Sequence, residues 1–152
     1  MVKKVLFSVL TAVLVLGFAA MPVAAATEAV RVSAAVMWVD TGIDVEAGDV
    51  LFLNAHGMAI TGPLSEYPEA ISGAGGQITT CNDGALPGMV CVLDGAAFGA
   101  LIGKIDGGAV FFIGDSSSFV AGSSGRLYLA VNDFLGTYDD NLGGFTVLFE
   151  GL

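Results

Sequence analysis

The sequence predicts an all-β protein folded as one antiparallel β-sandwich. Short apolar runs are separated by turns rich in Gly, Asp and Ser, and no segment after residue 26 keeps a 3.6-residue apolar period. Glycine accounts for 22 of the 152 residues, about twice the usual share, which disfavours long helices. The chain after residue 26 has room for one core and shows no linker or internal repeat, so we expect a single domain over residues 27–152.

Apolar runs mark the expected strands in order. The turn at 46–49 separates a run that ends at Val45 from another at 50–53, which is the spacing of a hairpin. Later strands are expected at 100–105, 109–113, 126–131 and 145–149. The last two alternate apolar residues, so that each presents one apolar face. The glycine-rich residues 63–99 lack such patterning and predict a long surface excursion.

Residues 1–26 have the composition of a secretory signal peptide. Lys3 and Lys4 precede an uncharged apolar run, Pro22 breaks any helix, and Ala24 to Ala26 offer a small-residue cleavage site. The alternative is a permanent membrane anchor, but the apolar run at 5–20 is shorter than the roughly 20 residues that span a bilayer. We therefore expect a secreted or periplasmic protein with no stable membrane insertion after cleavage.

The charge balance excludes some function classes. The chain has 15 acidic and 5 basic residues and a net charge of −10. Five basic residues cannot build the positive surface that nucleic acids require, and a hydrophobic content of 55% excludes a disordered chain. The acidic surplus has two interpretations: a bound divalent cation that relieves the repulsion, or a surface that keeps an exported protein soluble.

The two cysteines, Cys81 and Cys91, lie in one Gly/Pro-rich stretch. Export exposes them to oxidising conditions, and a disulfide between them would close a short loop, which stabilises a fold by roughly 2–3 kcal/mol. Two thiols without a nearby histidine make a poor zinc site, and the single histidine, His56, is distant in sequence. We expect a structural disulfide.

A loop between two expected strands concentrates oxygen donors. Residues 132–143 carry carboxylates and amides at Asp133, Asp139, Asp140, Asn132 and Asn141. Gly136 and Gly143 allow the backbone to curl so that carbonyl groups point inward. Calcium takes 6–8 oxygen ligands in irregular geometry, as such a loop supplies, although the spacing is not that of an EF-hand. From these residues alone, a solvated acidic turn is the simpler interpretation.

The pattern Asn-Asp-x-x-Gly-Thr-Tyr-x-[Asp/Asn]-Asn-x-Gly-x-Phe at 132–145 resembles the calcium loop of the PA-I-type galactophilic bacterial lectins. Three further matches occur in the same order: 47–50 before a strand, 55–57 leading to Gly62-Pro63, and 99–101 leading to 104–105. The resemblance covers most of the chain after residue 26. It implies a single jelly-roll-like β-sandwich, bound Ca²⁺ and galactosides or other glycans with vicinal hydroxyls as partners.

Carried over position by position, the resemblance implies five protein ligands for one Ca²⁺. They are the side chains of Asp133, Asp140 and Asn141 and the backbone carbonyls of Thr61 and Thr137. In that family two vicinal sugar hydroxyls complete the coordination, so the metal is itself the sugar receptor. The resemblance accordingly places Asp133, Phe134, Thr137 and Asp140 at the sugar.

The sequence departs from the family pattern at two places. The family usually has Asn where this chain has Asp140, and the additional negative charge predicts firmer calcium binding. The family's second sugar-contacting loop carries a His-Pro-x-Gln motif that is absent here; between Pro63 and Gly99 the chain has no histidine and is longer than that loop. Gln77 is the candidate for the glutamine of that motif.

Other residues permit rival interpretations. Asp40-Thr41-Gly42 matches the tripeptide of aspartic proteases, but Ile43 replaces the small residue expected next, and we favour a turn between strands. His56 fits a hydrogen-bonded position at the end of a strand. The aromatic candidates for stacking on a sugar face are Trp38, Tyr67 and Tyr138, with core positions as the alternative.

The leading hypothesis is an exported, calcium-dependent carbohydrate-binding domain that prefers galactose-like sugars. The resemblance is compatible with a homo-oligomer, and no residue pattern fixes a stoichiometry. No nucleophile and base lie within plausible reach of each other in the sequence, so we do not expect an enzyme. The alternative is a structural or adhesion β-sandwich in which Ca²⁺ only ties loops together, with no sugar binding.

Overall fold

The computed structural model describes residues 28–77, 79–81 and 87–150, and it confirms an all-β sandwich with antiparallel strands. The expected signal peptide lies outside the described residues. The strands are β1 (Glu28–Ser33), β2 (Val39–Val45), β3 (Val50–Ile60), β4 (Ile71–Ser72), β5 (Leu101–Ile105), β6 (Phe111–Phe112), β7 (Ser116–Val120), β8 (Gly125–Val131) and β9 (Leu142–Glu150). One 3₁₀ turn, η1 (Tyr138–Asp140), precedes β9. The described part of the chain contains no helix with the length and apolar character to cross a membrane.

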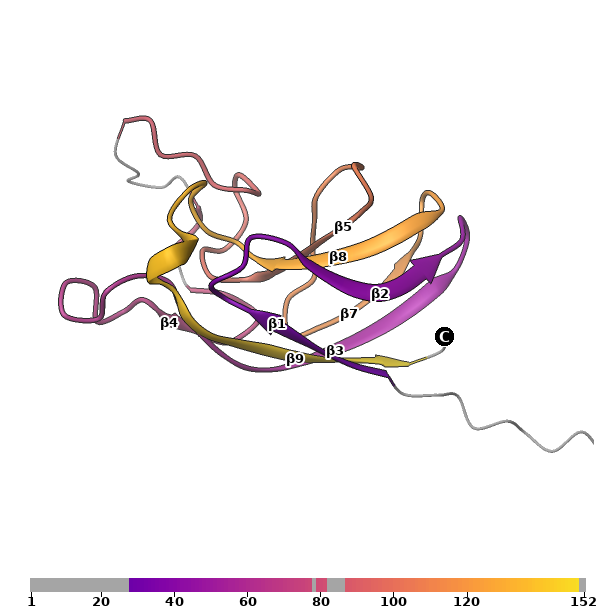
Figure 1. Cartoon of the computed structure of the whole chain (residues 1–152), viewed down its shortest axis with the longest axis horizontal. Helices are drawn as coiled ribbons and strands as arrows, with labels where there is room; N and C mark the ends of the chain where they lie inside the picture. Colours follow the sequence, from indigo (N-terminus) through magenta and orange to yellow (C-terminus); the bar gives the residue numbers. More distant parts are fainter. Residues whose placement is uncertain (1–27, 78, 82–86, 151–152) are drawn as a thin grey trace, which may run out of the picture.

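The strands form two packed sheets (Figure 1). The first has the order β1-β9-β3-β4, and β7 also pairs with β3. One edge of β3 is bonded to β9, and the other is shared by β7 near its start and β4 at its end. The second sheet has the order β2-β8-β5-β6.

The core fills the space between the sheets with alternate residues of each long strand. The predicted alternation is confirmed in β8 and β9, whose inward-facing side chains are at most 2% exposed: Leu127, Leu129, Val131, Phe145, Val147 and Phe149. Burying one such side chain contributes about 1.5–3 kcal/mol to stability. This rigid core fixes the ends of the strands, where the loops begin.

The predicted hairpin across residues 46–49 is wrong. β2 pairs with β8 in one sheet, whereas β3 belongs to the other, so this turn carries the chain from one sheet to the opposite one. Val45 and Leu51 both face the core, but from opposite sides. Alternation identifies the buried face of a strand and does not identify its neighbour, which is why spacing alone suggested a pair.

Several element boundaries also differ from the prediction. β3 continues to Ile60, so His56 lies within the strand, exposed and opposite Thr146, and not at its end. Asp40-Thr41-Gly42 lies inside β2, at an irregularity in the β2–β8 register, and not in a turn. The expected strand at 109–113 is reduced to the two residues of β6.

Three strands were not predicted. β1 follows the expected signal peptide, β4 has only two residues, and β7 is rich in serine. β7 forms because its backbone completes the hydrogen bonds along the start of β3, from Val50↔Val120 to Asn54↔Ser116. Sheet pairing therefore overrides the weak strand propensity of this segment.

The register between β3 and β9 positions the candidate site. The pairing ends at Ile60↔Leu142. Thr61, which follows β3, and Asn141, which precedes β9, therefore lie side by side at the end of the sheet. β8 ends at Val131 and passes directly into Asn132 and Asp133. These three chain segments meet at one end of the sandwich, where η1 crosses it (Figure 1).

Gly57 allows β3 and β9 to approach each other closely in this register, so its substitution tests the pairing. Its φ is +130°, and a Cβ atom there would collide with the carbonyl oxygen of Gly144 in β9. Gly57→Ala should therefore lower the free energy of unfolding by at least about 2 kcal/mol more than Gly42→Ala, measured by urea denaturation. Gly42 is the matched control, because its φ is +78° and nothing lies within 4 Å of a Cβ there. Equal losses in the two variants would contradict the described β3–β9 packing.

Candidate functional site

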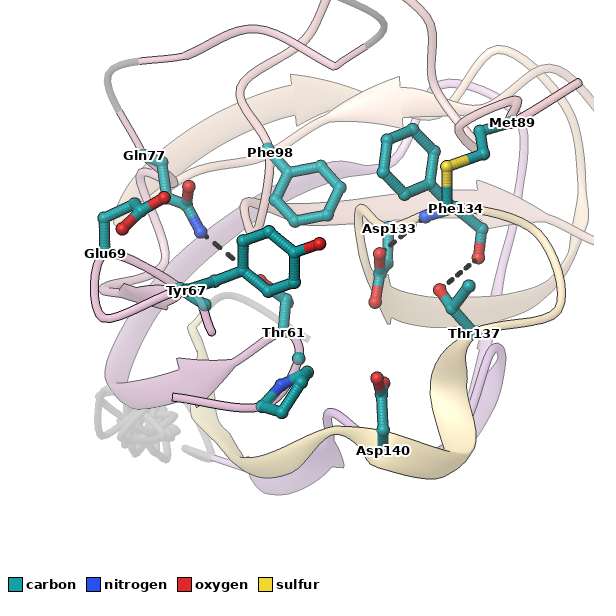
Figure 2. A pocket seen from close by; sticks show the side chains of 13 residues that line it. Thr61, Tyr67, Glu69, Gln77, Met89, Phe98, Asp133, Phe134, Thr137 and Asp140 are labelled. Carbon is teal, nitrogen blue, oxygen red and sulfur yellow. Dashed lines mark hydrogen bonds between the residues drawn. The ribbon is translucent and has the colours of Figure 1, made fainter. Parts of the chain in front are cut away.

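A cavity of about 440 Å³ opens at the end of the sandwich where β3, β8 and β9 meet their loops (Figure 2). Three stretches surround it: the residues that follow β3, the excursion at 63–99, and the loop between β8 and β9. The lining residues are Thr61, Gly62, Pro63, Tyr67, Glu69, Ala70, Gln77, Met89, Phe98, Asp133, Phe134, Thr137 and Asp140. The volume is in the range typical of small-molecule sites.

The structure brings the sequence-predicted site residues together. Of the residues expected at metal or sugar, all but Asn141 line the cavity: Thr61, Gln77, Asp133, Phe134, Thr137 and Asp140. Asn141 lies directly behind them, because its Nδ2 donates a hydrogen bond of 2.7 Å to Asp133 Oδ2. Figure 2 shows the carboxylates of Asp133 and Asp140 pointing towards each other across the cavity.

Asp133 is the most constrained acidic group of the site. Its residue is 2% exposed, and its Oδ1 accepts a hydrogen bond of 2.6 Å from the backbone N–H of Phe134. Burial raises the pKa of this carboxyl above its usual range, although hydrogen bonds from Asn141, Phe134 and Thr137 oppose the shift. The negative charge of Asp140 raises the pKa of Asp133 further.

Asn141 carries a buried acceptor that has no hydrogen-bond partner among the described residues. Its Nδ2 donates to the backbone oxygen of Ala34 at 3.1 Å and to Asp133, whereas its Oδ1 accepts nothing. An unpaired buried amide oxygen typically costs about 1–3 kcal/mol, so such an atom calls for a partner. A hard cation is a suitable partner, because amide and carboxylate oxygens are its preferred ligands.

The donor set fits calcium in its chemistry. It consists of two carboxylates, one amide oxygen and the backbone carbonyls of two threonines, all oxygen atoms. Within the described residues, no three or more His, Cys, Asp or Glu side chains form a group able to hold a metal ion. The expected ligand set contains only two such side chains, Asp133 and Asp140, and takes its remaining oxygens from an amide and the backbone.

The excursion contributes apolar side chains to the cavity. Tyr67, Met89 and Phe98 come from this segment, and the ring of Phe98 packs on that of Phe134 with centroids 5.1 Å apart. Gln77 Nε2 donates a hydrogen bond of 3.3 Å to Thr61 Oγ1, which joins the excursion to the residues after β3. The excursion is therefore part of the cavity as well as surface.

Sequence reasoning missed Glu69, Met89 and Phe98. All three lie in a segment without periodicity, where no residue pattern indicates which side chains turn inward. The cysteine pair was the one sequence feature that indicated a fixed contact in this segment. The predicted disulfide between Cys81 and Cys91 is confirmed, with Cα atoms 5.9 Å apart.

The other candidate residues lie elsewhere. Asp40 binds Arg126 Nη1 at 2.9 Å, and a hydrogen bond from the Gly42 N–H, followed by that from Arg126, lowers the pKa of Asp40. Trp38 packs under the ammonium of Lys104, 4.2 Å from the ring centroid. Tyr138 is buried, its hydroxyl donates to the Val131 carbonyl at 2.7 Å, and burial raises its pKa. Of the three aromatic candidates for stacking, only Tyr67 lines the cavity.

Comparison with solved structures gives a likeness over most of the chain. A solved structure described as the EclA N-terminal domain, a PllA-like lectin, matches with a TM-score of 0.62 and 22% identity, covering 80% of this chain and 93% of that one. No protein-family model matches, and no curated protein matches. At this identity the likeness shows the fold alone, an antiparallel β-sandwich of two sheets.

The buried carboxyl of Asp133 predicts a pH dependence in the presence of a chelator. Because its folded-state pKa is raised, its contribution to stability is retained below the unfolded pKa of about 3.8 and is lost as pH rises through the folded pKa. The melting temperature of the natural protein should therefore fall relative to that of Asp133→Asn as pH rises from about 4 to 7. Asp139→Asn, an exposed change in the same loop, should not show this trend. A constant difference between the natural protein and Asp133→Asn would contradict the assignment.

Proposed function

We propose that this chain is a calcium-dependent lectin whose cavity binds one Ca²⁺ and, through it, a sugar with vicinal hydroxyls. The observation that carries the proposal is the unpaired Oδ1 of Asn141 beside the buried carboxylate of Asp133, at a cavity of about 440 Å³. Buried acceptors in such an arrangement favour a cation. The lectin fold of the neighbouring solved structure is consistent with a sugar as the ligand.

The residues that would hold the ion are Thr61, Asp133, Thr137, Asp140 and Asn141. When bound, Ca²⁺ would offset the charge of the two facing carboxylates and exchange its waters for the hydroxyl oxygens of a sugar. Asp133 would accept hydrogen bonds from those hydroxyls. The acidic surplus of the whole chain, with net charge −10, favours association with cations in general.

The remaining cavity surface is suited to the carbon face of a pyranose. Aromatic rings and thioethers pack against C–H groups, and Tyr67, Phe98 and Met89 supply them on one wall. Phe134 and Gln77 complete the contacts on either side. Galactose-like sugars are the proposed class, because the resemblance of the loop at 132–145 is to galactophilic lectins.

An exported location accords with the site and the covalent structure. The disulfide between Cys81 and Cys91 is typical of proteins in oxidising compartments, where free Ca²⁺ and glycans are both available. A single shallow site of this type binds weakly, so useful avidity would need several copies in one assembly. A homo-oligomer therefore remains part of the proposal.

The second candidate function is a structural domain in which Ca²⁺ only ties loops together. The absence of the His-Pro-x-Gln motif favours it, since the motif supplies sugar contacts in the family that the loop resembles. Both candidates predict stabilisation by Ca²⁺. Only the lectin predicts heat of sugar binding that disappears with a chelator.

Asp133→Ala should abolish both calcium and sugar binding, measured by calorimetry with Ca²⁺ and then with galactosides. The reason is that it removes the one buried carboxylate of the site, and we expect at least a 100-fold loss of calcium affinity. Asp139→Ala is the matched control, because Asp139 is exposed in the same loop and does not line the cavity.

Two results would decide between the candidates. Calcium uptake by the natural protein without sugar heat across a glycan panel would leave the structural role. Calcium binding that Asp133→Ala leaves intact would overturn the proposed site itself.

Tyr67→Ala should weaken sugar binding about 3- to 10-fold and leave calcium affinity unchanged, because the ring lines the cavity but supplies no proposed ligand. Leu64→Ala is the control, since Leu64 is also partly exposed in the same turn and does not line the cavity. Calorimetry at saturating Ca²⁺ measures both variants. Equal sugar affinity in the two would remove Tyr67 from the site.

A further inference from the structure

Residues 90–93 are hydrogen-bonded along the start of the loop between β8 and β9. The N–H of Val92 donates to the Asp133 carbonyl at 3.1 Å, and the N–H of Leu135 donates to the Val90 carbonyl at 2.8 Å. Between them, Cys91 and Phe134 form an antiparallel bridge. The loop that carries Asp133 is thus paired with a segment about forty residues away in sequence.

The side chain of Asn132 forms hydrogen bonds with the same segment. It is fully buried, its Oδ1 accepts the N–H of Leu93 at 2.9 Å, and its Nδ2 donates to the carbonyls of Leu93 and Ala97 at 3.0 and 3.2 Å. Its own backbone is bonded to Gly99 and Ala100. Asn132 therefore uses its side chain to bind the excursion and not to face the cavity.

The disulfide joins this pairing to a second one. Cys81 donates its N–H to the Ala96 carbonyl at 2.7 Å, next to the bridge between Thr80 and Ala97. Cys91 is the residue opposite Phe134. Both cysteines are buried, and their bond ties the two strand-like pairings of the excursion into one unit.

We propose that the Cys81–Cys91 disulfide and Asn132 form a clamp that positions Asp133 and Phe134, so that the oxidised chain binds more tightly in the cavity than the reduced chain. The clamp holds the backbone on both sides of the Asp133 side chain and sets the ring of Phe134 against Phe98. These are positioning residues, because neither cysteine nor Asn132 lines the cavity. The binding consequence rests on the proposed function, whereas the ordering of the loop does not.

The excursion has little regular secondary structure. Between 63 and 99 the described residues form only the two-residue strand β4 and isolated bridges. Without the disulfide, the pairing at 90–93 must be formed by a chain that is free to move over many more conformations. The sandwich itself does not depend on these contacts, since neither cysteine belongs to the main core cluster.

The test compares the oxidised full chain with Cys81→Ala/Cys91→Ala and, separately, with Asn132→Ala. Amide hydrogen exchange without added metal is the first readout, followed at the clamp amides of Val92 and Leu135 and at the core amides of Leu127 and Val147. We expect exchange at the clamp amides to rise at least 10-fold more than at the core amides. Leu129→Ala, a core change away from the excursion, is the control for general destabilisation.

Calcium affinity by calorimetry is the second readout, with Ca²⁺ alone as the probe. The double-cysteine variant should bind at least 5-fold more weakly than the oxidised chain at a temperature where both are folded, and Leu129→Ala should not. Reduction of the natural protein by a water-soluble phosphine must give the same loss: the phosphine takes up an oxygen from water, and the disulfide becomes two thiols. Reoxidation should restore affinity.

The possible outcomes test the clamp and the proposed function separately. Uniform exchange at clamp and core amides, or an unchanged calcium affinity in a variant whose oxidised parent binds, would overturn the clamp. If the oxidised chain binds no Ca²⁺ at all, the proposed function fails, and selective exchange at Val92 and Leu135 alone then decides whether the disulfide orders the loop.

Discussion

The antiparallel pairing of β3 with β9 is the constraint from which the rest of the structure follows. It runs from Phe52↔Glu150 to Ile60↔Leu142 and is the central contact of the larger sheet. A slip of one residue would turn every core side chain of β9 towards solvent, so burial fixes the register. The same register sets Thr61 next to Asn141, although they are far apart along the chain. The packing of the core therefore determines the geometry of the cavity.

The polar side of the cavity lowers the stability of the folded state. Asp133 is buried with its pKa raised, a second carboxylate faces it, and the amide oxygen of Asn141 has no hydrogen-bond partner within the described part of the chain. A sequence selected for stability alone would not keep these three features together at one place, because each opposes folding. Such local conflicts concentrate where a ligand resolves them. The conflict at Asp133 and Asn141 is therefore more informative about function than the well-packed core is.

The sequence predicted some features well for identifiable physical reasons. Alternation in β8 and β9 indicated the core faces, and the pattern from Asn132 to Phe145 indicated a loop of which Asp133 and Asp140, but not Asp139, line a cavity. The pairing of β2 with β8 was missed because the alternation of apolar residues does not indicate which strands lie next to each other. Glu69, Met89 and Phe98 were missed because they lie in a segment without periodicity, and part of that segment is held by long-range hydrogen bonds from Asn132 to Leu93 and Ala97. Asn132 itself was grouped with the oxygen donors, since residue type does not reveal which way a side chain turns.

The two sides of the cavity have different origins in the chain. Asp133 and Phe134 come from the loop that follows β8, and Thr61 directly follows β3, whereas Tyr67, Met89 and Phe98 come from the long excursion at 63–99, which contributes Ala74 to the main core cluster. An excursion of this kind tolerates exchange of side chains far better than a strand end does. The recognition properties of this scaffold can accordingly diversify through one segment, during evolution or in the laboratory, while the acidic residues beneath it stay unchanged.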